Sequence, residues 1–178
     1  MEFNILYGLQ SLRGGFLDNV MVTVFNTLVG SKGEIWAVLG ALLLIFRKTR
    51  KAGLCVLLSY AVAYGIGDVL KNIIARPRPC AIDETVALII SRPSSFSCPS
   101  VHTMLAFASA ASLFLCHKKT GIAVLVFAAL VGFSRMYFFV HFPTDVLLGA
   151  VLGFGVGVGV FYAVSAIGKK IGQKKTHA

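Results

Sequence analysis

The chain has 178 residues and a net charge of +10, and it is 57% hydrophobic and only 13% charged. A soluble domain carries about 25% charged residues, and a chain of this length could not bury so much apolar surface in one small core. The composition therefore excludes an ordinary soluble domain and indicates an integral membrane protein. Nucleic-acid binding is disfavoured as well, because the basic residues fall in short clusters between apolar segments.

The N-terminal residues lack the pattern of a removable signal peptide, because no clean apolar core follows a basic start. Residues 15–30 mix apolar side chains with Asp18, Asn19 and Asn26. This segment could lie in the membrane interface as an amphipathic helix. We favour the alternative of a short membrane span.

Five clearer apolar segments follow, at residues 35–46, 52–70, 101–116, 121–140 and 144–167. Several must extend into their flanks as helices, since about 20 residues are needed to cross the hydrocarbon of a bilayer. The predicted fold is an all-α integral membrane protein, a bundle of five to six transmembrane helices that forms one domain over residues 1–178. In the last segment, Gly149 and Gly153 have the spacing that lets helix backbones approach closely.

Three basic clusters alternate with these segments: residues 47–51, 117–119 and the tail from Lys169 to Lys175. They should lie on one side of the membrane, which the positive-inside rule makes cytoplasmic. The C-terminus is then cytoplasmic, and the location is the plasma membrane. The polar segments 71–99 and 134–144 share the extracytoplasmic side.

Three polar clusters should meet at that outer end. The first contains Lys71 and the run Arg76-Pro77-Arg78-Pro79, whose prolines stop the preceding helix. The second, residues 97–103, leads into an apolar helix, and free N–H groups at a helix N-terminus form an anion site. The third runs from Ser134 to Asp145. Each cluster alone has a plainer interpretation, as snorkelling cations or capping residues, but their convergence favours a phosphate site.

A histidine and an aspartate in the third cluster are the candidate chemical groups. His141 and Asp145 are four residues apart, so the carboxylate could reach the imidazole across one helical turn. An Asp–His pair fixes the tautomer and leaves the other ring nitrogen free to attack. Arg76 and Arg92 add positive charge nearby, which favours a diphosphate, although they could instead contact lipid headgroups.

The spacing of the three clusters resembles the signature of the type 2 phosphatidic acid phosphatases, relatives of the vanadium haloperoxidases. That signature reads Lys-x6-Arg-Pro, then Pro-Ser-Gly-His, then Ser-Arg-x5-His-x3-Asp. The matching motifs here are Lys71-x6-Arg78-Pro79, Pro99-Ser100-Val101-His102 and Ser134-Arg135-x5-His141-x3-Asp145. One position departs from the family: Val101 stands where glycine is usual, which is expected to affect rate and substrate shape more than the chemistry.

The resemblance implies a phosphatase that requires no metal or cofactor. His141 would attack phosphorus and form a phosphohistidine, Asp145 would orient it, and His102 would protonate the leaving oxygen and then help to activate water. The implied phosphate-binding residues are Lys71, Arg78, Ser100, Val101 and Arg135, with the backbone amides of Val101 and His102. The chain has no Cys/His cluster with zinc spacing.

The expected substrate is a lipid phosphate or diphosphate, with a polyprenyl (undecaprenyl) diphosphate favoured because family members of that kind are small and face outward. The first alternative is phosphatidylglycerophosphate or phosphatidate. The alternative from another class is a catalytically silent lipid-binding or transport protein. A haloperoxidase is disfavoured because those relatives are soluble. The expected partners are the lipid phosphate and membrane lipids, and the oligomeric state is open.

The sequence contains four cysteines. Cys55 and Cys116 lie in apolar segments and are expected to be ordinary buried residues. Cys80 and Cys98 lie in the outer polar segment, where oxidation is possible. We predict a disulfide between them, with two free thiols as the alternative, because sequence cannot fix their separation.

Overall fold

The structure is a computed structural model that describes residues 1–176, and beyond residue 170 it describes the side chain of Gln173 alone. The described residues form helices and connecting loops, with no strand among them. In chain order the helices are α1 (Glu2–Gln10), α2 (Gly15–Val20), η1 (Met21–Leu28), α3 (Glu34–Ile45), α4 (Arg50–Ile74), α5 (Pro79–Ile82), α6 (Val101–Cys116), α7 (Lys118–Tyr137) and α8 (Pro143–Thr176).

Three stretches are long and apolar enough to cross a membrane: Arg50–Ile82, Lys118–Tyr137 and Pro143–Lys170. The helices α3 and α6 are apolar but shorter. The five clear segments expected from the sequence are therefore all helices, and the fold is that of an all-α membrane protein.

Residues 15–30 form α2 and the π-helical η1, and neither is among these apolar helices, so the favoured sixth span is not supported. Instead Phe25 of η1 is buried and stacks on Phe127 of α7, at 5.5 Å between ring centroids.

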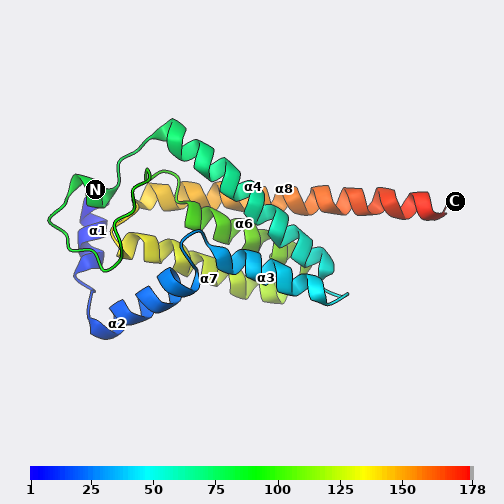
Figure 1. Ribbon diagram of the computed structural model, residues 1–178, viewed down its shortest axis with the longest axis horizontal. Helices are drawn as coiled ribbons and strands as arrows, with labels where there is room; N and C mark the ends of the chain where they lie inside the picture. Colours follow the sequence, from blue (N-terminus) through cyan, green and yellow to red (C-terminus); the bar gives the residue numbers. More distant parts are fainter. Residues whose placement is uncertain (177–178) are drawn as a thin grey trace.

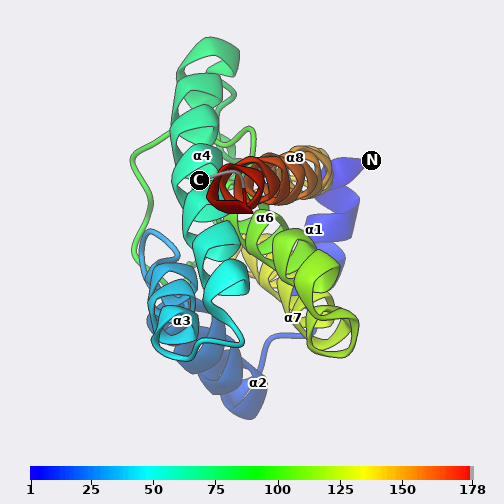
Figure 2. The same cartoon turned by 90° about the vertical axis from the view of Figure 1, so that its right-hand side faces the viewer.

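The helix α6 occupies the middle of the bundle, with α4, α7 and α8 packed around it (Figures 1 and 2). Its small side chains allow this, and Ala106, Ala108 and Ala110 are fully buried. The glycines of α8 bring the two backbones together. A Cβ atom added at Gly153 would lie 2.2 Å from the Met104 carbonyl oxygen, and one at Gly149 would lie 2.6 Å from that of Ser100. The close approach predicted for the Gly149–Gly153 pair is therefore confirmed.

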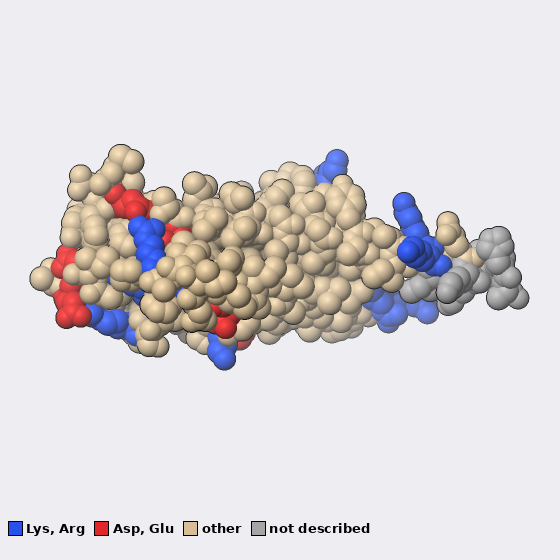
Figure 3. All heavy atoms as spheres, turned by 90° about the horizontal axis from the view of Figure 1, so that it is seen from above, with Lys and Arg blue, Asp and Glu red and all other residues tan. Residues whose placement is uncertain are grey.

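The two ends of the bundle differ in charge. The α3–α4 link, the α6–α7 link and the end of α8 lie at one end, and the N-terminus and the loop of residues 75–100 lie at the other (Figure 1). On the face drawn in Figure 3, acidic side chains gather at the N-terminal end, whereas basic ones alone mark the opposite end. The basic clusters thus share one end, as their alternation with the helices predicts.

The predicted Cys80–Cys98 disulfide is wrong, because both cysteines are free and buried. Cys80 packs into the main hydrophobic cluster from the short helix α5. Burial and the neighbouring Asp145 carboxylate raise the pKa of the Cys98 thiol to about 11. Cys55 is buried and Cys116 half-buried, as expected.

Candidate active site

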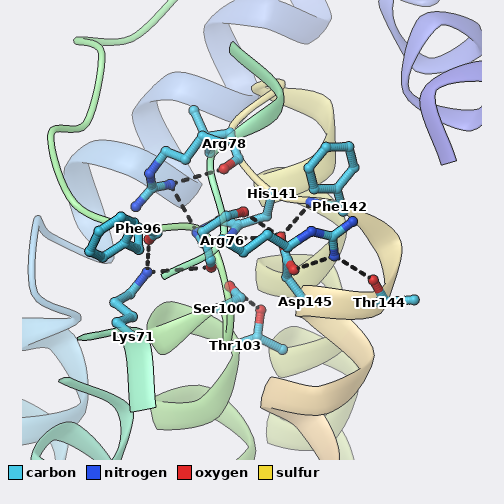
Figure 4. Close-up of polar contacts among 12 residues, drawn as sticks. Lys71, Arg76, Arg78, Phe96, Ser100, Thr103, His141, Phe142, Thr144 and Asp145 are labelled. Atoms are coloured by element: carbon cyan, nitrogen blue, oxygen red, sulfur yellow. Dashed lines mark hydrogen bonds and ion pairs between the residues drawn. The ribbon is translucent and has the colours of Figure 1, made fainter. Parts of the chain in front are cut away.

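The three sequence motifs converge at the N-terminal end of the bundle (Figure 4). Lys71 lies in the last turn of α4, His102 in the first turn of α6, Arg135 in the last turn of α7, and Asp145 in the first turn of α8. His141 lies in the short link between α7 and α8. The candidate residues exposed by no more than 8% are Lys71, Arg78, Ser100, Arg135, His141 and Asp145.

Two backbone reversals bring these motifs together. The helix α4 ends at Ala75, which has a left-handed φ of 49° and returns its N–H to the Lys71 carbonyl. The link between α7 and α8 turns at Phe139, with φ of 60°. Positive φ values in residues with a Cβ are uncommon and mark places where the surrounding packing fixes the backbone. Both reversals adjoin cluster residues.

The two nitrogens of His141 have different partners. Arg78 Nη1 lies 3.2 Å from His141 Nε2, and since a guanidinium can only donate, Nε2 accepts. The ring proton is then on Nδ1, which lies 3.7 Å from Asp145 Oδ2. That separation is longer than a hydrogen bond, so the two groups are adjacent but not hydrogen-bonded. This tautomer places the His141 lone pair on Nε2, as a nucleophilic imidazole requires, and Arg78 must release that atom before it can attack an electrophile.

The Asp145 carboxylate is fully buried and held by three donors. The backbone N–H of Phe142 donates to Oδ2 at 2.8 Å, the Ser97 hydroxyl donates to the same oxygen, and Arg76 Nη1 donates to Oδ1 at 2.8 Å. The sequence pattern does not single out Ser97 as a site residue, and it associates Arg76 with substrate charge or lipid headgroups. The position of Ser97 within the second cluster was the one available signal.

The three candidate phosphate-binding cations are held by neutral partners. Lys71 Nζ donates to the carbonyls of Phe96 and Ser97, Arg78 to those of Ser95 and Val140, and Arg135 to that of Phe25. Among the described residues, none of the three cations forms an ion pair with a carboxylate. Their positive charge is therefore oriented but not neutralised, and an anion could take it up.

One ring nitrogen of His102 is hydrogen-bonded to the protein backbone. Its Nε2 lies 3.1 Å from the Gly30 carbonyl oxygen, which can only accept, so Nε2 carries the proton. The Nδ1 atom is left to take up and release a proton, as an acid–base group must. Gly30 stands just before α3, at φ +85°, and sequence analysis gave it no role.

Ser100 and Val101 differ from what the motif suggests. The Ser100 hydroxyl bonds to the Thr103 hydroxyl at 2.9 Å, and its backbone N–H bonds to the Asp145 carbonyl, so Ser100 joins α6 to α8. Its predicted phosphate contact stays a prediction. The Val101 side chain lines the cavity and packs on Gly67 of α4, where an added Cβ would lie 2.9 Å from Val101 Cγ2. A glycine on the neighbouring helix thus makes room for the valine.

The site opens into a cavity of two compartments, with volumes of about 230 Å³ and about 380 Å³. Both are lined by Arg78, His102 and His141. The smaller one adds Lys71 and Val101, and the larger one adds Arg135 and a serine-rich loop at residues 91–95. The nucleophile and acid–base candidates therefore line both compartments, each of which also has two of the three cations, and this arrangement suits phosphoryl transfer.

The fold and the site together define a helical membrane protein with a buried Asp–His pair beside a cavity whose two compartments are lined by three cations. Residues 52–169 match the family model described as the PAP2 superfamily, and the chain belongs to that superfamily.

The relatives of this chain include proteins that are named as lipid phosphatases. The chain is 37% identical over 120 residues to an undecaprenyl-diphosphatase from Sulfolobus acidocaldarius, covering 67% of this chain and 58% of that longer protein. It is 36% identical over 174 residues to phosphatidylglycerophosphatase B from Bacillus subtilis, covering 90% of this chain and 79% of the relative. A crystal structure of a PAP2 type phosphatidylglycerolphosphate phosphatase from Bacillus subtilis superposes with a TM-score of 0.71 at 32% identity, covering 94% of this chain and 84% of that one.

Proposed function

We propose that this protein, as one domain over residues 1–178, hydrolyses a lipid phosphate or diphosphate through a phosphohistidine intermediate. The observation that carries the proposal is His141: its lone-pair nitrogen Nε2 contacts Arg78 beside the cavity, and Asp145 lies behind its Nδ1. Among the described residues, the three cations have no carboxylate partner. The relatives named for lipid phosphatase activities support the same class of reaction.

The steps follow from the partners of each group. Lys71, Arg78 and Arg135 hold the phosphate oxygens, assisted by Ser100 and by the free N–H groups of Val101 and His102 at the start of α6. His141 Nε2 bonds to phosphorus while the bond to the leaving oxygen breaks. His102, which enters this step protonated on both ring nitrogens, gives that oxygen its Nδ1 proton. His102 then takes a proton from water, which attacks phosphorus and breaks the P–N bond. Free phosphate leaves and His141 is regenerated.

The membrane setting favours a lipid over a soluble ester. The cavity lies at the end of the apolar helices, so a lipid tail could stay among them while the headgroup meets the cations. Tail burial contributes about 0.8 kcal/mol per CH₂ to membrane partitioning, which concentrates a lipid near the site. A soluble ester lacks this gain and should show a higher KM. No metal or cofactor has a step in this scheme.

Within lipid phosphates we favour a polyprenyl diphosphate such as undecaprenyl diphosphate, with the site on the extracytoplasmic face of the plasma membrane and the C-terminus in the cytoplasm. The similarity to an undecaprenyl-diphosphatase supports this choice. The charge argument is weaker than the sequence suggested, because Arg76 pairs with Glu2 and Asp145, and Arg92 pairs with Glu84. Phosphatidylglycerophosphate is the second candidate, favoured by the relative that covers 90% of this chain.

The test is phosphate release by the purified protein in detergent from undecaprenyl diphosphate, phosphatidylglycerophosphate, phosphatidate and a soluble ester. We expect the highest kcat/KM with the diphosphate and none of this activity in His141→Ala. A clear preference for phosphatidylglycerophosphate would replace the substrate but keep the mechanism. A folded wild-type protein that releases no phosphate from any of them would instead favour a lipid-binding or transport role.

A second experiment addresses the intermediate. Wild-type protein quenched in base during turnover of a phosphate-labelled lipid should carry label that is stable to base and released by acid, as a phosphorus–nitrogen bond is. His141→Ala should carry no label. Label that resists acid would indicate an ester on a hydroxyl group and contradict the phosphohistidine.

A further inference from the structure

Arg76 lies between the N-terminal helix and the buried aspartate of the site. Its Nη1 donates to Asp145 Oδ1 at 2.8 Å and to the Thr144 hydroxyl at 2.7 Å (Figure 4). Its Nη2 donates to Glu2 Oε2 at 2.6 Å. One guanidinium therefore binds α1 and the first turn of α8 at the same time. Such a fork of fixed donors is a property of arginine that lysine lacks.

Arg76 is itself held from several sides. Its guanidinium carbon lies 4.0 Å from the centroid of the Phe142 ring, a cation–π arrangement. Glu2 accepts from Arg76 and also, through Oε1, from the Thr144 hydroxyl and N–H. Burial alone would raise the pKa of Glu2, but these hydrogen bonds lower it below its usual value, so Glu2 is ionised and pairs with Arg76.

The orientation of the Asp145 carboxylate depends on the hydrogen bond from Arg76. Ser97 and the Phe142 N–H both hold Oδ2, the oxygen that faces His141 Nδ1 at 3.7 Å. Among the side chains that the structure describes, Arg76 is the donor to the other oxygen, Oδ1. Without it the fully buried carboxylate would lose this hydrogen bond to Oδ1 and its arginine partner.

Arg76 differs in this from the phosphate-binding cations. Within the described residues it lines neither compartment of the cavity, whereas Arg78, two residues further on, lines both. Two arginines in the run Arg76-Pro77-Arg78 thus lie on opposite sides of the Asp–His pair: Arg78 meets His141 Nε2 and Arg76 meets Asp145 Oδ1.

We propose that Arg76, held in place by Glu2, is a positioning residue that orients the Asp145 carboxylate against His141 and is needed for full turnover. This inference rests on the proposed function and adds a role for α1, which lies outside residues 52–169 matched by the family. A displacement of about 1 Å in such a support can lower turnover about 100-fold, because attack depends on the angle of the imidazole.

The test compares Arg76→Met, Arg76→Lys and Glu2→Gln with wild type and His141→Ala, using the lipid on which wild type is most active. Arg76→Met should lower kcat about 100-fold and leave KM and the inhibition constant of inorganic phosphate within about 3-fold, since Arg76 does not reach the cavity. Arg76→Lys should restore part of kcat through its remaining charge. Glu2→Gln should lower kcat less than Arg76→Met, since Asp145 keeps its arginine.

Arg13→Met is the matched control. Arg13 is also a partly buried arginine at this end of the bundle, and it pairs with Asp18 at 3.8 Å, away from the cavity. The Arg13→Met variant should keep the wild-type kcat.

A wild-type kcat in folded Arg76→Met would overturn the positioning role. So would a KM and a phosphate inhibition constant that rise together with a falling kcat. If Arg76→Met does not fold, Arg76→Lys and Glu2→Gln carry the same test. Inactive wild type would instead count against the proposed function.

Discussion

At the scale of single residues, the protonation of His141 follows from its surroundings. Burial lowers the pKa of His141 well below its usual value, the positive charges of Arg78 and Lys71 lower it further, and only Asp145 acts in the other direction. The imidazole therefore stays neutral in the folded protein at pH values where a free histidine is protonated. A neutral ring keeps the lone pair that attack on phosphorus needs.

The same shift predicts how stability depends on pH. Below about pH 6.5 the unfolded chain protonates this histidine and the folded protein does not, so the free energy of unfolding falls as pH falls, by about 1.4 kcal/mol per pH unit for this group. The measurement is thermal unfolding in detergent at several pH values for wild type and His141→Asn. The variant should lose this part of the slope, and an unchanged slope would show that other groups are responsible.

The pair Val101 and Gly67 gives a second prediction at this scale. Gly67→Ala should destabilise the wild type by about 1 kcal/mol, because its Cβ would lie 2.9 Å from Val101 Cγ2. In a Val101→Gly background the nearest remaining neighbour is Met104 Sδ at 3.4 Å, so the cost should largely disappear. Thermal unfolding of the four proteins measures this coupling. Additive effects would mean that Gly67 does not accommodate the valine.

At the scale of elements, the contact between α6 and α8 positions the site, because His102 and Asp145 are in the first turns of these two helices. The contact depends on glycines that bring the α8 backbone against the α6 carbonyls. Ser100 reinforces it at the site end by donating its N–H to the Asp145 carbonyl.

Gly153→Ala should therefore destabilise the protein by about 1–3 kcal/mol, since a methyl group 2.2 Å from the Met104 carbonyl oxygen forces the helices apart. Gly155→Ala is the matched control two residues along the same helix, where an added Cβ meets nothing within 4 Å. The control should be neutral or slightly stabilised, because alanine has the higher helix propensity. Equal losses in both variants would mean that the close approach is not what Gly153 provides.

At the scale of the whole molecule, the different charges of the two ends of the bundle indicate its orientation in the membrane. The basic links and the end of α8 share one end of the bundle (Figures 1 and 3). The cavity is at the other end, where His102 and His141 line it. If the positive-inside rule holds, the cavity opens away from the cytoplasm.

This orientation predicts a labelling pattern in intact cells. A membrane-impermeant thiol reagent should modify a cysteine placed at Glu84, an exposed residue beside the cavity loop, and should miss one placed at Lys119 in the α6–α7 link. After permeabilisation both should react, which controls for accessibility. Labelling at Lys119 alone in intact cells would invert the topology and leave the chemistry unchanged.

The membrane class, the five apolar helices and the convergence of the three motifs can all be read from the amino-acid sequence. These features depend on local signals: apolar length, prolines that end helices, and a spacing that places His141 one turn from Asp145. The glycine contact of α8 was also readable, because the residues that allow it are neighbours on one helix face.

The partner of each polar group, in contrast, depends on how the chain folds in three dimensions. Arg76 and Ser97 are 69 and 48 residues from Asp145 in sequence, and Gly30 is 72 residues from His102. Pattern gives the type of a residue but not the direction of its side chain or the nearest opposite charge. It therefore associates Arg76 with substrate charge or lipid headgroups, and it pairs Cys80 with Cys98. These contacts depend on how α1, the segment before α3 and the loop of residues 83–100 pack over the bundle, which is a property of the folded chain.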